Sequence, residues 1–397
     1  MSDGEIRRAL QRIHAPDELE AQRRAWPLVR AAFDAREPIA WPRRQARPLA
    51  AAAVAVALLA AALTPPGRAL VGGVRDAFTS EKVKARPALT SLPASGLLLV
   101  NSPRGPWIVQ RDGSKRLLGA YEEGSWSPHA LHVAVTRGHE LAALDPKGVV
   151  RWSLARSGAV HAARWSPGPG DRIAYLNGRA LRIVAGDGTG DAPLRRPVAQ
   201  TPPAWRPGAS HELAFSTAEG RIELVQTDSA QTIWRTGSGE VPKQLVWSED
   251  GQRLLVLADR WLHVLDSQGS RLGTIGLPIG PSGIAFVRRS HRFVLVRYVP
   301  ATGRSDLVLL RAEPEHGEPR FLYSAPGDFG TLAISPNGNW LLVGWINADQ
   351  WLFLRLTAAE VKAVSNIAEQ FGTPRPVGQP LSSAFPGSVS WCCPVSP

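Results

Sequence analysis

Cysteine is almost absent from this 397-residue sequence, because its only two cysteines are the adjacent Cys392 and Cys393. This number excludes a disulfide framework and any Cys-x-x-Cys metal site, and it is compatible with either a reducing or an oxidising compartment. The adjacent pair has two interpretations: a vicinal disulfide, which is strained, or two free or packed thiols.

The common catalytic motifs are absent as well. The sequence contains no Gly-x-Ser-x-Gly elbow, His-Glu-x-x-His motif or Walker loop, so the usual hydrolase, zinc-protease and nucleotide-binding signatures are missing. The one close pair of histidines, His129 and His132, is interpreted as surface or structural. The segment Asp187 to Asp191 resembles part of a calcium loop but lacks the remaining oxygen ligands, so a hairpin is expected there. We expect no enzyme activity, no metal and no cofactor.

The formal charge of +12 comes without a concentrated basic patch. Residues 1–47 contain 10 arginines and 7 acidic residues, so the remaining +9 is spread over about 350 residues. No basic stripe is interleaved with aromatic residues as in nucleic-acid-binding surfaces. We therefore expect no nucleic-acid partner, and acidic polymers of the cell envelope would be attracted by this charge equally well.

Long hydrophobic runs are limited to one. Residues 49–63 read LAAAAVAVALLAAAL, with Arg43, Arg44 and Arg47 just before them. A transmembrane helix needs ~20 residues, so the predicted span is 48–67. A cleaved signal peptide and a buried Ala-rich helix are the alternatives. The arginines before the span favour a single-pass protein of the cell membrane with its N-terminus in the cytoplasm and the rest outside.

The region before the span, residues 1–47, is predicted to be cytosolic and helical. Within 17–37, Leu19, Trp26, Val29 and Phe33 share one helical face, which Pro27 interrupts. This face either rests on the membrane surface or binds a cytosolic protein.

After residue 120 one phrase recurs: a large apolar residue, usually Trp, then Ser or Arg, often Pro, a turn, and an apolar strand. The first copy precedes an expected strand at Leu131 to Val135. The repeat positions are Trp126, Trp165, Trp205, Trp247, Phe286, Ile334 and Trp391. Intervals of 39, 40, 42, 39 and 48 residues separate the first six. A period of ~40–45 residues corresponds to one four-stranded β-propeller blade per repeat.

The strands that follow the phrase are apolar at consecutive positions, as in Leu254 to Leu257 and Leu341 to Val343. Such strands are buried on both faces, as expected for blades stacked around an axis. Pro and Gly or Asn in the phrase favour a chain reversal.

The two ends of the repeat region predict a composite seventh blade. Three strands are expected between Gly96 and Gly119 with no first strand ahead of them, whereas Trp391 ends a first-strand phrase that no further strands follow. Joining them closes the ring and removes open sheet edges. The predicted organisation is an all-β, seven-bladed propeller at 96–397, preceded by a linker at 68–95, the transmembrane helix and the helical region.

The sixth repeat is the irregular one. Val361 to Val364 is either the outer strand of blade 6, followed by a short helical turn at 366–371, or part of one helix that begins near Thr357. The strand is preferred because the sheet otherwise lacks its outer member. Residues 373–386 then form a Pro-rich connection.

The Trp-Ser-Pro-x-Gly phrase resembles the repeats of TolB-type and WD-repeat-like propellers over residues 96–393. The Gly-His and Trp-Asp signatures of eukaryotic WD repeats are absent, which favours the bacterial TolB type. This resemblance implies a protein-interaction platform.

We thus expect a membrane-anchored, extracytoplasmic propeller that binds or scaffolds a protein or an envelope polymer. An alternative is a transmembrane regulator, whose layout resembles that of anti-sigma factors but without their His-x-x-x-Cys-x-x-Cys motif. A propeller enzyme with carboxylates or histidines around its axial channel is the third hypothesis.

Overall fold

The computed structural model describes residues 91–168, 170–209, 211–313, 317–372 and 381–393. The predictions for the N-terminal helical region, the membrane span and most of the linker lie outside these residues. Within the described ranges, no helix is long and apolar enough to cross a membrane.

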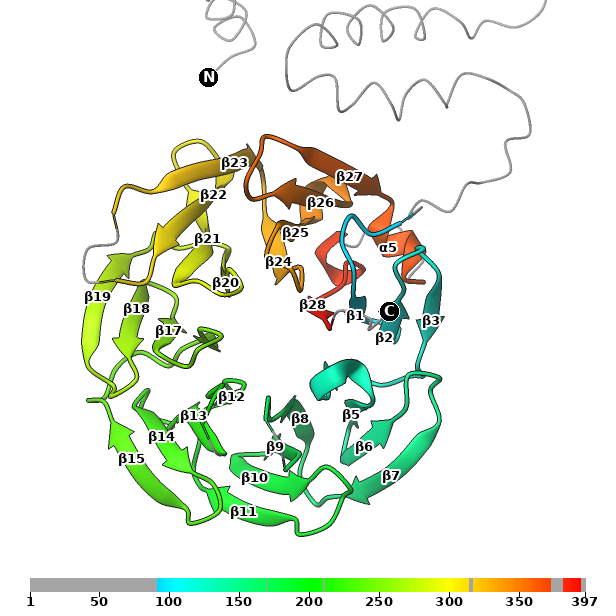
Figure 1. The fold of residues 1–397 in the computed structure, drawn as a ribbon, viewed down its shortest axis with the longest axis vertical. Coiled ribbons are helices and arrows are strands. Elements are labelled where there is room, and N and C mark those ends of the chain that lie inside the picture. Colours follow the sequence, from blue (N-terminus) through cyan, green and yellow to red (C-terminus); the bar gives the residue numbers. More distant parts are fainter. Residues whose placement is uncertain (1–90, 169, 210, 314–316, 373–380, 394–397) are drawn as a thin grey trace, which may run out of the picture. The chain divides into compact units, whose positions relative to one another are not determined.

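The described chain forms seven four-stranded antiparallel sheets arranged as blades around an axis (Figure 1). Blade 1 contains β4 (Glu123–Trp126), β5 (Val133–Arg137), β6 (Glu140–Leu144) and β7 (Val150–Ala155), and blade 2 contains β8 (Val160–Trp165), β9 (Arg172–Asn177), β10 (Ala180–Ala185) and β11 (Ala192–Arg195). Blade 3 contains β12 (Ala204–Trp205), β13 (Glu212–Ser216), β14 (Ile222–Gln226) and β15 (Gln231–Arg235), and blade 4 contains β16 (Gln244–Trp247), β17 (Arg253–Leu257), β18 (Trp261–Asp266) and β19 (Arg271–Gly276). Blade 5 contains β20 (Ser282–Phe286), β21 (Arg292–Val299), β22 (Arg304–Arg311) and β23 (Arg320–Pro326), and blade 6 contains β24 (Phe329–Ile334), β25 (Trp340–Trp345), β26 (Gln350–Arg355) and β27 (Val361–Ser365). The prediction of an all-β, seven-bladed propeller is confirmed.

Blade 7 is the predicted composite of the two chain ends. Its strand order is β28 (Ser388–Cys392), β1 (Leu97–Ser102), β2 (Gly105–Val109) and β3 (Lys115–Leu117). β28 pairs with β1 in an antiparallel register that runs from Leu97 opposite Cys392 to Asn101 opposite Ser388. The C-terminal strand therefore closes the ring, and no first strand is left unpaired.

The two ends of the blades differ. Six of the seven repeat residues end a first strand, and Trp391 lies one position before the end of β28. We call this end of the blades the tryptophan face, and it also carries the turns between first and second strands. The opposite end carries the turns between second and third strands and the links between blades, and we call it the connection face. The described chain begins at the tryptophan face, where the Leu92 N–H donates to the Arg111 carbonyl at 2.8 Å in the β2–β3 turn.

Each repeat residue packs between two blades. The buried core consists of seven clusters, one per blade interface, and each contains one of the repeat residues. Two of the indole N–H groups also donate a hydrogen bond to the preceding blade: Trp205 Nε1 donates to the Arg164 carbonyl at 2.8 Å, and Trp247 Nε1 donates to the Ala204 carbonyl at 3.2 Å. The repeat positions are thus structural in this fold.

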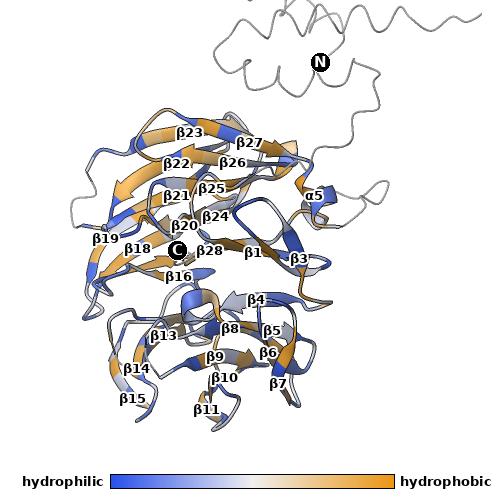
Figure 2. Ribbon diagram, turned by 45° about the vertical axis from the view of Figure 1, so that its right-hand side comes forward, coloured by the Kyte–Doolittle hydropathy of each residue, from blue (hydrophilic) through white to orange (hydrophobic). Residues whose placement is uncertain are grey.

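Consecutive apolar residues divide between neighbouring interfaces. In β17, Leu254 and Val256 belong to the cluster shared with blade 3, whereas Leu255 and Leu257 belong to the cluster shared with blade 5. This confirms burial on both faces of the strand. Figure 2 shows hydrophobic residues gathered on strands such as β1, β18 and β22.

Three details of the repeats follow from the structure. β27 and the short α5 (Ile367–Gln370) confirm the strand followed by a helical turn in blade 6. The 48-residue interval reflects the long hairpin of β21 and β22, each of 8 residues. The expectation of a strand from Leu131 is wrong: β5 begins at Val133, and Leu131, 63% exposed, lies in the turn after the short η1 (Pro128–Ala130). Two further single turns, η2 (Ile346–Ala348) and η3 (Leu381–Ser383), occur.

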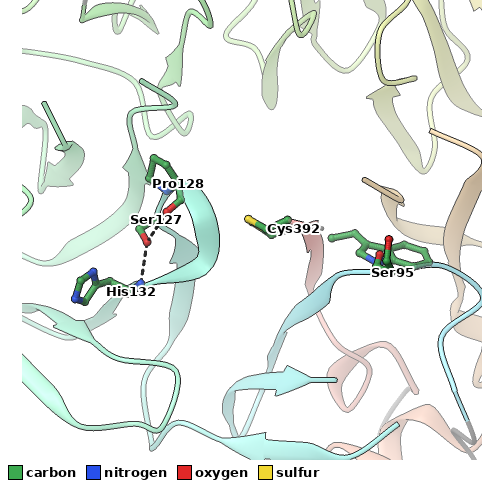
Figure 3. The surroundings of a disulfide bond; sticks show 7 residues. Ser95, Ser127, Pro128, His132 and Cys392 are labelled. Atoms are coloured by element: carbon green, nitrogen blue, oxygen red, sulfur yellow. Dashed lines mark hydrogen bonds between the residues drawn. A yellow bond between two sulfur atoms is a disulfide. The ribbon is translucent and has the colours of Figure 1, made fainter. Parts of the chain in front are cut away.

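The two cysteines lie where the ring closes. Their sulfur atoms are joined in a disulfide bond, and both residues pack against the cluster of Trp126 and Ala130. Figure 3 shows Cys392 between the turn of Ser127 and Pro128 and the segment of Ser95. The Ser127 hydroxyl holds this turn by accepting the His132 N–H at 2.8 Å.

Candidate binding cleft between blades 3 and 4

A cavity of about 380 Å³ lies between the sheets of blades 3 and 4 and opens at the connection face. Its walls come from the β13–β14 turn, the link between the two blades, and strands β17, β18 and β19. The lining residues are Gly220, Ile222, Thr236, Gly237, Ser238, Gly239, Glu240, Val256, Ala258, Trp261, His263, Leu265, Arg271 and Thr274. The volume is near the lower end of the ~300–1,000 Å³ usual for ligand pockets.

The cavity exists because the link after β15 carries almost no side chains. Residues 237–239 read Gly-Ser-Gly, so they leave unfilled the space that larger residues would take. The link lies close to the β13–β14 turn, where a Cβ on Gly220 would lie 2.0 Å from the Gly239 carbonyl oxygen. Gly220 also has a φ of +72°, a left-handed conformation that glycine adopts without strain.

The wall on the blade 4 side is a ladder of three residue pairs. In the register of β18 and β19, Trp261 lies opposite Gly276, His263 opposite Thr274, and Leu265 opposite Arg271. Alternate residues of a strand point to the same face, so Trp261, His263 and Leu265 all face blade 3. The Trp261 side chain is 45% exposed, whereas Leu265 is buried.

The charges are distributed along this ladder. His263 Nδ1 is 2.9 Å from Thr274 Oγ1, and burial, assisted by the positive charge of Arg271, lowers the pKa of His263 despite the opposing effect of Glu240. His263 is therefore neutral at pH 7. One oxygen of Glu240 already accepts the Asp259 N–H at 3.0 Å. Arg271 is exposed and forms no ion pair with any residue in the described part of the chain.

Exposed apolar residues continue the surface beyond the cleft. Val241, next to Glu240, is 43% exposed, and Ile279, three residues after Gly276, is 72% exposed. Both lie in links between blades, on the same face as the cleft mouth. Half-exposed aromatic and aliphatic residues beside a concave site are typical of an interaction surface.

A larger cavity of about 610 Å³ lies on the axial side of the first strands of blades 4 to 7. Four repeat residues line it: Trp247, Phe286, Ile334 and Trp391. Its lining includes one carboxylate, Glu249, and no histidine. Over the residues that the structure places, no group of three or more His, Cys, Asp or Glu could hold a metal ion.

The cleft contains none of the repeat residues: Trp205 and Trp247, which belong to the blades that form it, lie at the tryptophan face. Cys392 ends β28 in blade 7, and Cys393 follows it. The segment Asp187 to Asp191 lies in the β10–β11 hairpin, where Asp187 accepts the Thr189 N–H at 2.9 Å. His132 stacks on Trp165 with ring centroids 6.3 Å apart.

Sequence reasoning missed the cleft residues Trp261, His263 and Arg271. Two signals pointed to them: a tryptophan outside the repeat position, and the Gly-Ser-Gly link of residues 237–239. Neither signal shows, without the structure, that the two segments share one cavity.

No family model matches the sequence, and no curated protein matches it either. The solved structures that are similar to this chain support the β-propeller fold. One similar structure is a functionally unknown protein from Desulfotomaculum acetoxidans, 13% identical, with a TM-score of 0.53, covering 76% of this chain and 100% of that one. Another is the WD40 domain of Toxoplasma gondii coronin, 11% identical, with a TM-score of 0.52, covering 70% and 77%. A chain of the mitotic checkpoint complex is 14% identical, with a TM-score of 0.52, covering 70% and 95%. At these identities the similarity shows the fold alone, and the choice of TolB type over WD repeat stays a prediction.

Proposed function

We propose that this chain is a binding module, a propeller tethered outside the cytoplasm by a membrane span at 48–67, that holds a protein or an acidic polymer of the cell envelope in the cleft between blades 3 and 4. The observation that carries the proposal is the half-exposed Trp261 in the same cleft as Arg271, whose charge no described carboxylate pairs with. The cleft combines an aromatic surface with a positive charge that no described carboxylate neutralises, and this combination supports binding of a ligand.

The position of the cleft suits a tethered domain. The described chain begins at the tryptophan face, next to Arg111 in the β2–β3 turn. The cleft opens at the connection face, between the Gly220 turn and the link of residues 236–240. A tether attached before residue 91 would therefore join the propeller at the end opposite the cleft mouth.

Two reporter fusions test the location. A reporter active only outside the cytoplasm, fused after Pro397, is expected to be active, and the same reporter fused after Arg47, before the span, to be inactive. Activity of a cytoplasm-only reporter after Pro397 would refute the tethered, extracytoplasmic arrangement.

Affinity isolation from solubilised cell envelopes tests the binding. Full-length wild-type protein, Trp261→Ala and Phe321→Ala serve as baits. Phe321 is 58% exposed in β23 of blade 5 and provides a matched loss of an exposed aromatic residue. Material retained by wild type and Phe321→Ala but lost from Trp261→Ala supports the cleft as the binding site. Equal retention by all three proteins contradicts it.

A further inference from the structure

We infer that the ligand of the cleft is a carboxylate-bearing oligosaccharide, with one sugar ring stacked on Trp261 and a carboxylate bound by Arg271. This inference rests on the proposed function and gives it a ligand class.

The aromatic end of the ladder is built for a flat ligand. Trp261 lies opposite Gly276, and a Cβ on that glycine would lie 3.5 Å from the indole ring. The glycine thus leaves that side of the indole free of a side chain, while the other cleft residues leave 45% of Trp261 exposed. Tryptophan is enriched at binding surfaces, where its indole ring supplies a large and rigid contact area.

The rest of the cleft offers hydrogen bonds of the kind that sugar hydroxyls make. Ser238 and Thr274 are exposed hydroxyl residues in the lining. The Thr274 hydroxyl contacts His263 Nδ1, which leaves the Nε2 of the neutral ring for a ligand that can both donate and accept. Hydroxyls and a neutral imidazole match a polyhydroxylated ligand better than an apolar one.

The charge places the acidic group of the ligand beside Arg271, at the end of the ladder away from Trp261. Arg271 carries a guanidinium that no described carboxylate neutralises, and such a group binds carboxylates in a bidentate manner. Glu240 lies in the link at the mouth, where its negative charge disfavours an anion. The ligand carboxylate is therefore expected beside Arg271 and not beside Trp261.

The distance along the ladder requires more than one sugar unit. Trp261 and Leu265, which lies opposite Arg271, are four residues apart in β18. At ~3.4 Å per residue this is about 14 Å. A stacked ring and a bound carboxylate separated in this way belong to a short oligosaccharide.

An acidic peptide fits the same site less well. The cleft lies on the face of β18, and β18 is hydrogen-bonded to β17 on one side and β19 on the other. A peptide could not add as a strand to β18, because the backbone N–H and C=O groups of β18 already pair with its two neighbours. The carbonyl and amide groups of the peptide would enter a cleft of about 380 Å³ without the regular backbone hydrogen bonds of a β-sheet.

Isothermal titration of the full-length protein tests the inference. The probe is aldotetraouronic acid, whose single carboxylate lies on its glucuronate unit, and its methyl ester is the matched neutral ligand. The acid is expected to bind at low ionic strength, at least about tenfold more tightly than the ester, and to weaken as salt screens the Arg271 contact. Trp261→Ala and Arg271→Gln are each expected to lower the affinity for the acid at least about tenfold.

Phe321→Ala and Arg235→Gln are the matched controls, since both residues are exposed and neither lines the cleft. They should bind the acid as the wild type does, and circular dichroism should show all four variants folded.

The inference is overturned if the wild type gives no heat with the acid at millimolar concentration, if acid and ester bind equally, or if the controls lose as much affinity as the cleft variants. Retention of envelope protein that depends on Trp261, together with no binding of the acid, would refute the saccharide ligand and leave the binding-module proposal standing.

Discussion

Replacing Trp391 should reveal how much the closing strand contributes to stability. Trp391 is 4% exposed, its ring centroid is 5.8 Å from that of Phe353, and its indole N–H donates to the Ser95 carbonyl at 3.2 Å. It joins the C-terminal strand to blade 6 and to the segment before β1. The Trp391→Ala substitution therefore removes packing and a hydrogen bond at the interface that closes the ring.

The size of the effect follows from these contacts. A buried Trp→Ala change costs ~3–5 kcal/mol in the free energy of unfolding. At ~2.1 cal/mol/K per residue, a propeller of about 300 residues has an unfolding entropy of ~0.6 kcal/mol/K. The melting temperature should then fall by ~5–8 °C. Trp391→Phe keeps a ring against Phe353 but loses the bond to Ser95, so its cost should be about 1–2 kcal/mol.

Removing the strand is the stronger form of the same test. Deletion of residues 387–397 removes all of β28 and leaves Leu98 and Val100, both fully buried, without the strand that covers them. Unpaired strand edges and uncovered apolar side chains favour aggregation, so this protein should not fold stably. Deletion of residues 394–397 leaves β28 whole and is the control. Thermal unfolding of the purified variants, followed by circular dichroism, measures these effects. If neither Trp391→Ala nor the deletion of residues 387–397 changes the melting temperature, closure of the ring by β28 is refuted.

Two further predictions concern interfaces elsewhere. His291 contacts Glu313 at 2.8 Å and Asp250 at 2.7 Å. Burial lowers the pKa of His291, but these two hydrogen bonds outweigh burial, so the pKa of His291 is raised. For Asp250, burial raises the pKa, but hydrogen bonds from Ser248 and His291 outweigh burial and lower the pKa to about 2. The His291 contribution to stability is full below its unfolded pKa near 6.5 and is lost as pH rises through its folded value, whereas the Asp250 contribution is lost as pH falls from about 4 toward 2. Both groups are partly exposed, so each should contribute at most about 1 kcal/mol to the free energy of unfolding. His291→Gln should therefore flatten the decline in this free energy above pH 6.5, measured by urea unfolding. An unchanged slope would contradict this. Gly269→Ala should lower the free energy of unfolding by about 2–4 kcal/mol, because φ is +81° and the added Cβ would lie 2.6 Å from the Trp234 ring. Gly303→Ala is the control: φ is +63° and no atom lies within 4 Å of the added Cβ, so it should cost only about 1–2 kcal/mol. Equal melting temperatures for the two variants would show that Trp234 moves aside without cost.

The fold could be predicted because its signals repeat. The phrase at Trp126, Trp165, Trp205 and Trp247 marks the end of a first strand each time, since every blade interface needs one large apolar residue at that position. The composite blade could be predicted from what each terminus lacked. The turn before β5 was misplaced because Leu131, an apolar residue in an exposed turn, looks in sequence like the start of a strand.

The cleft could not be predicted in the same way. Its walls come from positions 220, 236–240 and 256–274, and only the stacking of blades 3 and 4 brings them together. A second group of tryptophans was missed for a related reason. Trp152 Nε1 donates to the Gly186 carbonyl at 2.8 Å and Trp234 Nε1 to the Ser267 carbonyl at 3.0 Å, and each holds the outer hairpin of the next blade. These contacts depend on geometry between blades, which has no signature within one repeat.

Site-specific photo-cross-linking in living cells tests most directly whether the propeller binds through this cleft. A photoreactive residue replaces Ser238 in the cleft or, as the control, Gln252, an exposed residue in the β16–β17 turn at the tryptophan face. We expect a discrete cross-linked adduct from position 238, loss of this adduct in the Trp261→Ala background, and no adduct from position 252. An adduct from position 252 alone, or one from position 238 that Trp261→Ala leaves unchanged, would contradict this expectation.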